Sequence, residues 1–138
     1  MEKAVTVGST FERNIIVNSN QTTSFLWEGE NVFSTPSMIA EMEETCRLLL
    51  KEKFLKDLEW DSVGTLVNVN HVAATPIGTD VKLHSKITAV NDRRITFEVE
   101  ARDRIEKIGS GTHERVIIDI KKFRHKFNEK IKKLEEDL

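Results

Sequence analysis

The chain has 138 residues, a length that fits one domain able to bury a hydrophobic core. Hydrophobic residues make up 38% and charged residues 32%, a balance typical of a globular rather than a disordered protein. The formal net charge of -2 gives no reason to expect a nucleic acid or an anionic membrane as a partner.

The sequence carries no sign of export or membrane insertion. Its first residues, Met1–Val5, are too polar for a signal peptide, and no apolar run approaches the roughly 20 residues that span a bilayer. The single cysteine, Cys46, cannot form an internal disulfide or build a thiolate metal site. We therefore expect a cytoplasmic protein.

The first element is a strand predicted over Phe11–Val17, which ends at the polar run Asn18–Gln21. An irregular aromatic stretch, Phe25–Phe33, follows, with Gly29 and Asn31 as turn residues.

A long helix is predicted next, from Thr35 to about Leu55. Ser34 or Thr35 can cap it, and Pro36 suits its first turn, where a missing N–H matters little. At about 100° per residue, one apolar stripe forms from Met38, Ile39, Met42, Cys46, Leu49 and Leu50. Glu43 falls on the edge of this stripe. A carboxylate that borders a core is disfavoured in its charged form unless a partner compensates, and such groups are candidates for chemistry.

Four antiparallel strands joined by short turns are predicted after the helix. They cover Val63–Ala74, Val81–Ala89, Ile95–Ala101 and Thr112–Lys122, with turns at Asn91–Asp92 and Lys107–Gly111. In the first of these strands, alternation places Val63, Thr65, Val67, Val69, His71 and Ala73 on one face, and Gly64 on the other.

The last segment, 123–138, repeats apolar residues at intervals of three or four. These residues are Phe123, Phe127, Ile131, Leu134 and Leu138, and their spacing predicts an amphipathic helix. We expect residues 1–122 to form one domain, with 123–138 as a charged helix packed on it or extending from it. One apolar helix followed by a strand meander predicts an α+β fold whose sheet wraps the helix.

Other side chains are weaker candidates for chemistry. His71 lies on an apolar strand face, where a satisfied core or interface histidine is the simplest interpretation and an acid, base or hydrogen-bond donor is the functional one. Arg115 is either a solvated cation or a ligand for an anion, and the role of His113 stays open. Cys46 lies within the apolar stripe, which indicates packing. No pair of histidines has the short spacing of a zinc-binding helix, so no metal is expected.

Three stretches of the chain together resemble a known family. They are Phe33–Cys46, Val63–Gly78 and Gly111–Ile118. Within them stand the Thr-Pro opening of the helix, the helix glutamate, and a His-x-x-x-Thr-Pro strand end. On these motifs the chain resembles the fluoroacetyl-CoA thioesterase-like group of the hot-dog-fold superfamily, up to about Lys122.

The resemblance implies a hot-dog fold, in which an antiparallel sheet wraps a central helix. It implies a homodimer or a dimer of dimers, paired across sheet edges, with active sites at the subunit interface. It also implies hydrolysis of short-chain acyl-CoA thioesters, with no metal and no cofactor beyond the coenzyme A of the substrate.

The resemblance assigns roles to individual residues. The family's catalytic threonine, glutamate and histidine fall on Thr35, Glu43 and His71. Its glycine near the thioester falls on Gly64 and its late-strand arginine on Arg115. For an aromatic lid ahead of the helix, Trp27 and Phe33 are available here, and Phe33 is the candidate for substrate contact.

The spacing of two of these residues limits how they can act. Thr35 and Glu43 are eight positions apart in the sequence, which is roughly 12 Å along a helix axis. One helix cannot bring both to a single thioester carbon. We therefore expect each site to combine Thr35 and Glu43 from different chains, or one of them to act indirectly.

The leading hypothesis is an acyl-CoA thioesterase, with Glu43 as nucleophile or general base, assisted by Thr35 and His71. A non-catalytic acyl-CoA-binding or metabolite-sensing domain is the alternative, because a fold alone does not imply activity. A purely structural dimerisation module is the third interpretation.

Overall fold

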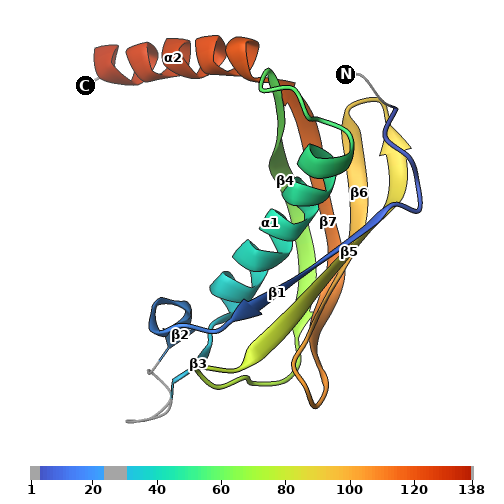
Figure 1. Ribbon diagram of the computed structural model, residues 1–138. Helices are drawn as coiled ribbons and strands as arrows, with labels where there is room; N and C mark the ends of the chain where they lie inside the picture. Colours follow the sequence, from blue (N-terminus) through green and yellow to red (C-terminus); the bar gives the residue numbers. More distant parts are fainter. Residues whose placement is uncertain (1–3, 24–30, 138) are drawn as a thin grey trace.

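The computed structural model describes residues 4–23 and 31–137 (Figure 1). In chain order the elements are β1 (Thr10–Ile16), a short 3-10 helix η1 (Ser19–Gln21), β2 (Thr22–Thr23), β3 (Val32–Phe33), α1 (Thr35–Lys53), β4 (Trp60–His71), β5 (Asp80–Asn91), β6 (Arg94–Arg102), β7 (Lys107–Asp119) and α2 (Ile120–Glu136).

Among the described residues, five strands form one antiparallel sheet in the order β1-β5-β6-β7-β4. The sheet curves around α1, so that one of its faces covers the helix (Figure 1). The predicted α+β arrangement is therefore confirmed. The two edge strands are β1 and β4, and β2 and β3 form a separate small ribbon.

α1 forms because its apolar residues recur on one face and its first turn is capped. The Ser34 side chain accepts a hydrogen bond from the Ser37 N–H, so Ser34 rather than Thr35 is the cap. The helix ends at Lys53, about two residues before the predicted end. Its buried face consists of Met38, Met42, Thr45, Cys46, Leu49 and Leu50, which pack among the inward side chains of the sheet.

The prediction of a turn over Lys107–Gly111 is wrong, because these residues are the beginning of β7. The chain reverses just before them, where the Asp103 carboxylate accepts hydrogen bonds from the N–H groups of Ile105 and Glu106. Gly109 lies inside the strand, and a Cβ there would come 2.6 Å from the Met38 sulfur. The glycine thus serves a close helix–strand contact and not a turn.

The predicted faces of β4 are correct only in its second half. A β-bulge between Gly64 and Leu66 shifts the register against β7, which adds a residue and reverses the alternation. Before the bulge, Ser62 and Gly64 face α1; after it, Val67, Val69 and His71 do. The bulge therefore turns Gly64 toward the helix, opposite to the face predicted for it.

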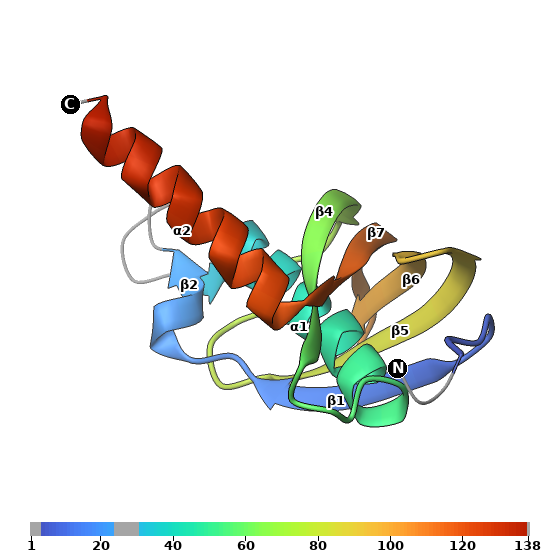
Figure 2. The same ribbon diagram turned by 90° about the horizontal axis from the view of Figure 1, so that it is seen from above.

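The predicted tail helix is confirmed and begins at Ile120, three residues early. Asp119 caps it, and the Ile120 N–H donates to the Glu59 carbonyl. α2 leaves the end of β7 and projects on the α1 side of the sheet (Figures 1 and 2). In the part of the chain that the structure describes, no helix has the length and apolar character needed to cross a membrane.

Candidate active site

Thr35 and His71 meet where the start of α1 passes the end of β4. Thr35 Oγ1 lies 2.8 Å from His71 Nδ1. Phe33, from β3, approaches the imidazole edge-on, with ring centroids 6.5 Å apart. The cap at Ser34 fixes the start of α1 and so holds Thr35 beside the strand.

The hydrogen bond between Thr35 and His71 leaves one hydrogen-bond donor of the pair unused. His71 Nε2 is buried and has no hydrogen-bond partner among the described residues. Burial lowers the pKa of His71 from its ordinary value, with a smaller opposing influence from the nearby Ala73 backbone, so the ring is neutral near pH 7. A neutral ring that accepts the Thr35 proton at Nδ1 carries its own proton on Nε2. In the other tautomer Nδ1–H donates to Thr35, and the Thr35 hydroxyl proton is free.

The pair lines a pocket of about 560 Å³. Its walls are largely apolar and include Val32, Phe33, Thr35, His71, Val72 and Ala73. Glu43 is not among the described residues that line it.

Glu43 belongs to a second cluster, further along α1. Its side chain is 40% exposed, and its Oε2 lies 4.0 Å from Arg115 Nη1. A Cβ on Gly64 would come 3.1 Å from the same carboxylate oxygen. The absence of a side chain at Gly64 is thus what allows the β4 backbone to lie close to Glu43.

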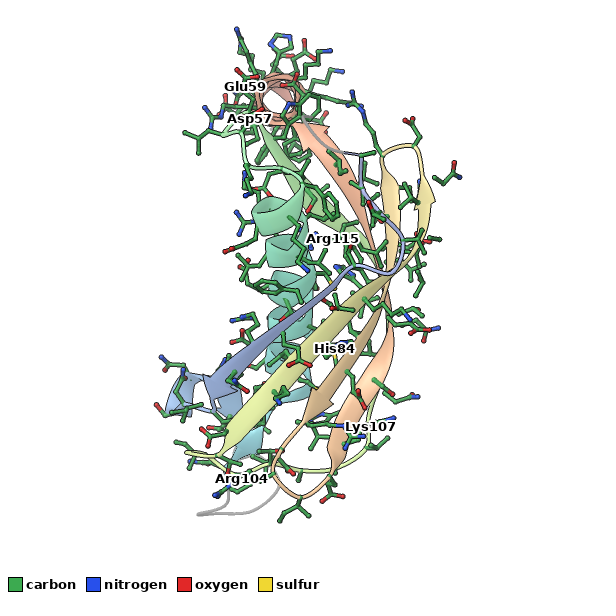
Figure 3. All side chains as sticks on the ribbon, turned by 45° about the vertical axis from the view of Figure 1, so that its right-hand side comes forward. Asp57, Glu59, His84, Arg104, Lys107 and Arg115 are labelled. Atoms are coloured by element: carbon green, nitrogen blue, oxygen red, sulfur yellow. The ribbon has the colours of Figure 1, made fainter. Side chains whose placement is uncertain are left out.

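Arg115 is held rigidly in the space between α1 and the sheet (Figure 3). Its Nε donates to Ser62 Oγ at 2.7 Å and its Nη2 to the Ser62 carbonyl at 2.8 Å. Its Nη1 lies 3.1 Å from His113 Nε2. Because guanidinium nitrogens only donate, His113 Nε2 accepts, and His113 Nδ1–H donates to the Leu66 carbonyl at 2.7 Å.

Burial sets the electrostatics of this second cluster. Burial lowers the pKa of Arg115, and the negative charge of Glu43 partly opposes this. Burial also lowers the pKa of His113, and the hydrogen bond to Leu66 partly opposes this. Burial raises the pKa of the Cys46 thiol far above its ordinary value. Cys46 is thus a neutral packing side chain.

The structure separates the residues proposed from the sequence into two groups. Thr35, His71 and Phe33 share the pocket, while Glu43, Gly64 and Arg115 lie together elsewhere on α1 and the sheet. Trp27, the other lid candidate, lies outside the described residues. Among those that are described, no three His, Cys, Asp or Glu side chains are grouped to hold a metal ion.

His113 is the member of the second cluster whose role the sequence left open. Its side chain is 1% exposed. Strand alternation already places it on the same face as Arg115, two residues on. That periodicity was the available signal, although nothing in it indicated the contact with Leu66 across the sheet.

Comparison with known proteins connects these features to a family. The profile of the fluoroacetyl-CoA-specific thioesterase family matches residues 17–121. The chain is 34% identical to the fluoroacetyl-CoA thioesterase of Streptantibioticus cattleyicolor over 137 residues, which cover 94% of this chain and 97% of that protein.

Solved structures agree in fold. A structure of the fluoroacetyl-CoA thioesterase FlK has a TM-score of 0.83 at 32% identity, covering 93% of this chain and 98% of that one. A hot-dog-like protein from Thermanaerovibrio acidaminovorans has a TM-score of 0.79 at 21% identity, covering 90% and 91%, and supports the fold alone. The sheet and central helix are those of a hot-dog fold.

Proposed function

The chain belongs to the fluoroacetyl-CoA-specific thioesterase family and is a thioester hydrolase acting on acyl-CoA, and from this we propose that its substrate carries a short acyl chain. We assign the catalytic roles to Thr35, Glu43 and His71. Hydrolysis breaks the carbonyl carbon–sulfur bond, forms a carbon–oxygen bond and leaves a proton on the coenzyme A sulfur. Water is the only co-reactant this balance needs.

The observation that carries the assignment is the Thr35–His71 hydrogen bond in the pocket. In either tautomer the pair keeps one donor unused, His71 Nε2–H or the Thr35 hydroxyl. Such a donor stabilises the charge that develops on the thioester oxygen or the leaving sulfur. A buried nitrogen without a partner costs stability, on the order of 1–3 kcal/mol, so its presence supports a role in the reaction.

Glu43 is the nucleophile or the general base in this proposal. Its carboxylate attacks the thioester carbonyl or removes a proton from the attacking water. Gly64 allows the substrate to approach the backbone beside it. Arg115, held by Ser62 and His113, keeps a positive charge near the carboxylate or receives an anionic group of the substrate.

Two chains are needed to complete such a site. Within one chain the pocket contains Thr35 and His71, and Glu43 lies outside its lining. β4 is an edge strand that, in the described part of the chain, pairs with β7 alone, and its Leu66 and Val67 are 46% and 40% exposed. We therefore assign the site to a homodimer paired along β4, which brings Glu43 of one chain to the pocket of the other.

The substrate class suits the pocket. Its volume of about 560 Å³ and its apolar walls, including the buried Phe33, fit a short acyl group. The relatives named for fluoroacetyl-CoA support a two-carbon chain in particular.

The test is thiol release from a panel of acyl-CoA thioesters of increasing chain length. We expect turnover of the shortest thioesters by the native chain and a loss of about 10²–10⁴-fold in Glu43→Gln. Glu44→Gln is the matched control, because Glu44 is a neighbouring carboxylate paired with Arg47. Equal activity in the two variants would remove Glu43 from the mechanism, and saturable binding without any turnover would point to an acyl-CoA sensor.

Hydrolysis in ¹⁸O-labelled water tests whether Glu43 forms a covalent acyl intermediate. Label found in the Glu43 carboxylate after turnover requires a covalent acyl intermediate on that residue. Label confined to the released acid is expected for direct attack by water with Glu43 as general base, and equally for an anhydride that water opens at its acyl carbon, so only labelling of Glu43 is decisive.

A further inference from the structure

α2 exposes an apolar stripe that its own chain leaves uncovered. The stripe comprises Phe123, Phe127, Ile131 and Leu134, whose exposures are 43%, 55%, 38% and 58%. Within the described part of the chain, none of the residues of α2 is buried. The helix is about 25 Å long, and a row of large apolar side chains along such a surface marks an interaction site.

The position of α2 relative to the sheet indicates which molecule covers the stripe. α2 is anchored at the residue just before β4, through the bond from the Ile120 N–H to the Glu59 carbonyl. Asp57 and Glu59 mark this end of the molecule in Figure 3. From there α2 runs away from β1, the opposite edge strand, and beyond the β4 edge (Figure 2).

If two chains pair along their β4 edges, the geometry of that pairing determines which part of the partner chain lies beside α2. Two identical edges that pair about a twofold axis normal to the sheet run antiparallel. The start of β4 in one chain then lies beside the end of β4 in the other, where Thr35 and His71 line the pocket. That end also exposes apolar side chains, with Val72 at 68% and Ile77 at 46% exposure.

The charge of α2 suits a position at the entrance to an acyl-CoA site. The helix carries seven lysines and arginines against three glutamates, whereas the whole chain has a net charge of -2. Lys126, Lys130 and Lys133 flank the apolar stripe and line a groove with Phe123, Phe127 and one carboxylate, Glu129. A row of ammonium groups there matches the phosphates of coenzyme A.

We propose that α2 docks by its apolar stripe on a second copy of this chain, beside the Thr35–His71 pocket, and places Lys126 and Lys130 against the phosphates of the bound acyl-CoA. The partner helix is then one wall of each active site. The inference rests on the β4-paired dimer of the proposed function and adds a residue set that the sequence resemblance did not include.

Crosslinking tests the docking without using activity. Chains carrying Phe127→Cys are mixed with chains carrying Val72→Cys and treated with a short bismaleimide; the native Cys46 is buried and stays unreactive. We expect a crosslinked dimer on a denaturing gel. Lys132→Cys mixed with Val72→Cys is the control, because Lys132 lies on the opposite side of the helix, and its yield should be several-fold lower.

Kinetics tests the role of the lysines. The double variant Lys126→Glu and Lys130→Glu should raise KM for acyl-CoA about tenfold. It should leave KM unchanged for the acyl-pantetheine thioester, which lacks the phosphates. Lys132→Glu, on the opposite face, should change neither.

The outcomes distinguish the two proposals. Suppose that the native chain is active and is dimeric by sedimentation. Equal crosslinking of the Phe127→Cys and Lys132→Cys variants, or an unchanged KM in the lysine double variant, then overturns the docking of α2 and leaves the proposed function standing. A strong preference for the Phe127→Cys pair in a chain that hydrolyses no acyl-CoA overturns the proposed function and leaves the docking. A monomeric native chain overturns both.

Discussion

Arg115 and His113 show how a buried cation is kept in place by neutral partners. Every polar nitrogen of the guanidinium has a hydrogen bond or charge contact, to Ser62, His113 or Glu43. His113 accepts from Arg115 only while its Nε2 carries no proton, so the same bond that orients Arg115 requires a neutral imidazole. Leu66, at the bulge in β4, fixes the tautomer from the other side of the ring.

Stability should therefore fall in mild acid. The pKa of His113 lies below its ordinary value of 6.5, mainly because of burial, and that of His71 is lowered in the same direction. Below about pH 6.5 the unfolded chain binds protons that the folded chain excludes, so the free energy of unfolding decreases as the pH falls. Urea unfolding at about pH 7.5 and about pH 5.5 measures this slope.

The variant His113→Phe measures how much of this pH dependence of the free energy of unfolding comes from His113. Its ring can keep the stacking on Phe97, whose centroid is 6.2 Å from that of His113. We expect lower stability at neutral pH, since Leu66 and Arg115 lose a partner, together with a smaller decrease toward acid. His125→Phe, on exposed α2, controls for the loss of one imidazole. An unchanged slope in His113→Phe would contradict the assignment.

Gly64→Ala tests the close approach of β4 to Glu43, the carboxylate proposed to be catalytic. The added Cβ would lie 3.1 Å from both Glu43 Oε2 and His113 Cε1, so these side chains must shift by a few tenths of an ångström. We expect a decrease in kcat of about tenfold or more, because the carboxylate is misplaced, with little loss of folding stability. Val63→Ala, at the adjacent position on the outer face, is the control; equal kcat values in both variants would show that the space at Gly64 is not needed.

At the scale of elements, a polar network joins β1 to α1. Arg13 donates to the Glu41 carboxylate at 2.8 Å and to Thr45 Oγ1 at 3.2 Å, and Gln21 donates to the other Glu41 oxygen at 2.6 Å. Glu41 and Arg13 are only 19% and 22% exposed. The edge strand β1 is thereby tied to the middle of the helix that it crosses (Figure 1).

Removing this tie should destabilise the fold more than removing a surface ion pair. Arg13→Met keeps most of the side-chain volume and loses the charged hydrogen bonds, at a cost of about 2 kcal/mol in the free energy of unfolding. Arg94→Met is the comparison, because Arg94 is 54% exposed in its pair with Glu114, and such pairs contribute about 0–1 kcal/mol. Equal losses in the two variants by urea unfolding would contradict this ranking.

At the scale of the whole molecule, the residues proposed to be catalytic lie in two separate places within one chain. Thr35 and His71 lie at the end of β4, and Glu43 lies beside Gly64 near its middle. In the dimer proposed above, pairing through β4 would complete both sites at once, because each chain would supply to its partner what it lacks.

Mixing inactive variants tests this arrangement directly. Co-expressed Thr35→Ala and Glu43→Gln chains form mixed dimers in which one site has both native residues and the other has neither. With random pairing we expect about a quarter of the native activity, against almost none for either variant alone. Activity that stays at the level of the single variants would place Thr35 and Glu43 of one chain in the same site.

Several elements could be predicted from the sequence because their signals are local. The stripe on α1, the alternation in β5 and β6, and the spacing of Phe123, Phe127 and Ile131 gave the right element types, with boundaries off by a few residues. The start of β7 was misplaced because Gly109 and Gly111 are typical of turns. Only the contact of Gly109 with Met38 explains a glycine inside that strand.

The sequence by itself determined the α+β class and the buried face of the central helix, since periodicity is a property of neighbouring positions. Its resemblance to a known family marked Thr35, Glu43 and His71 as candidate residues. The tertiary structure decided that the bulge turns Gly64 toward Glu43, that His113 fixes Arg115, and that Thr35 contacts His71 while Glu43 lies apart. These facts depend on contacts between residues far apart in the chain, which no local pattern encodes.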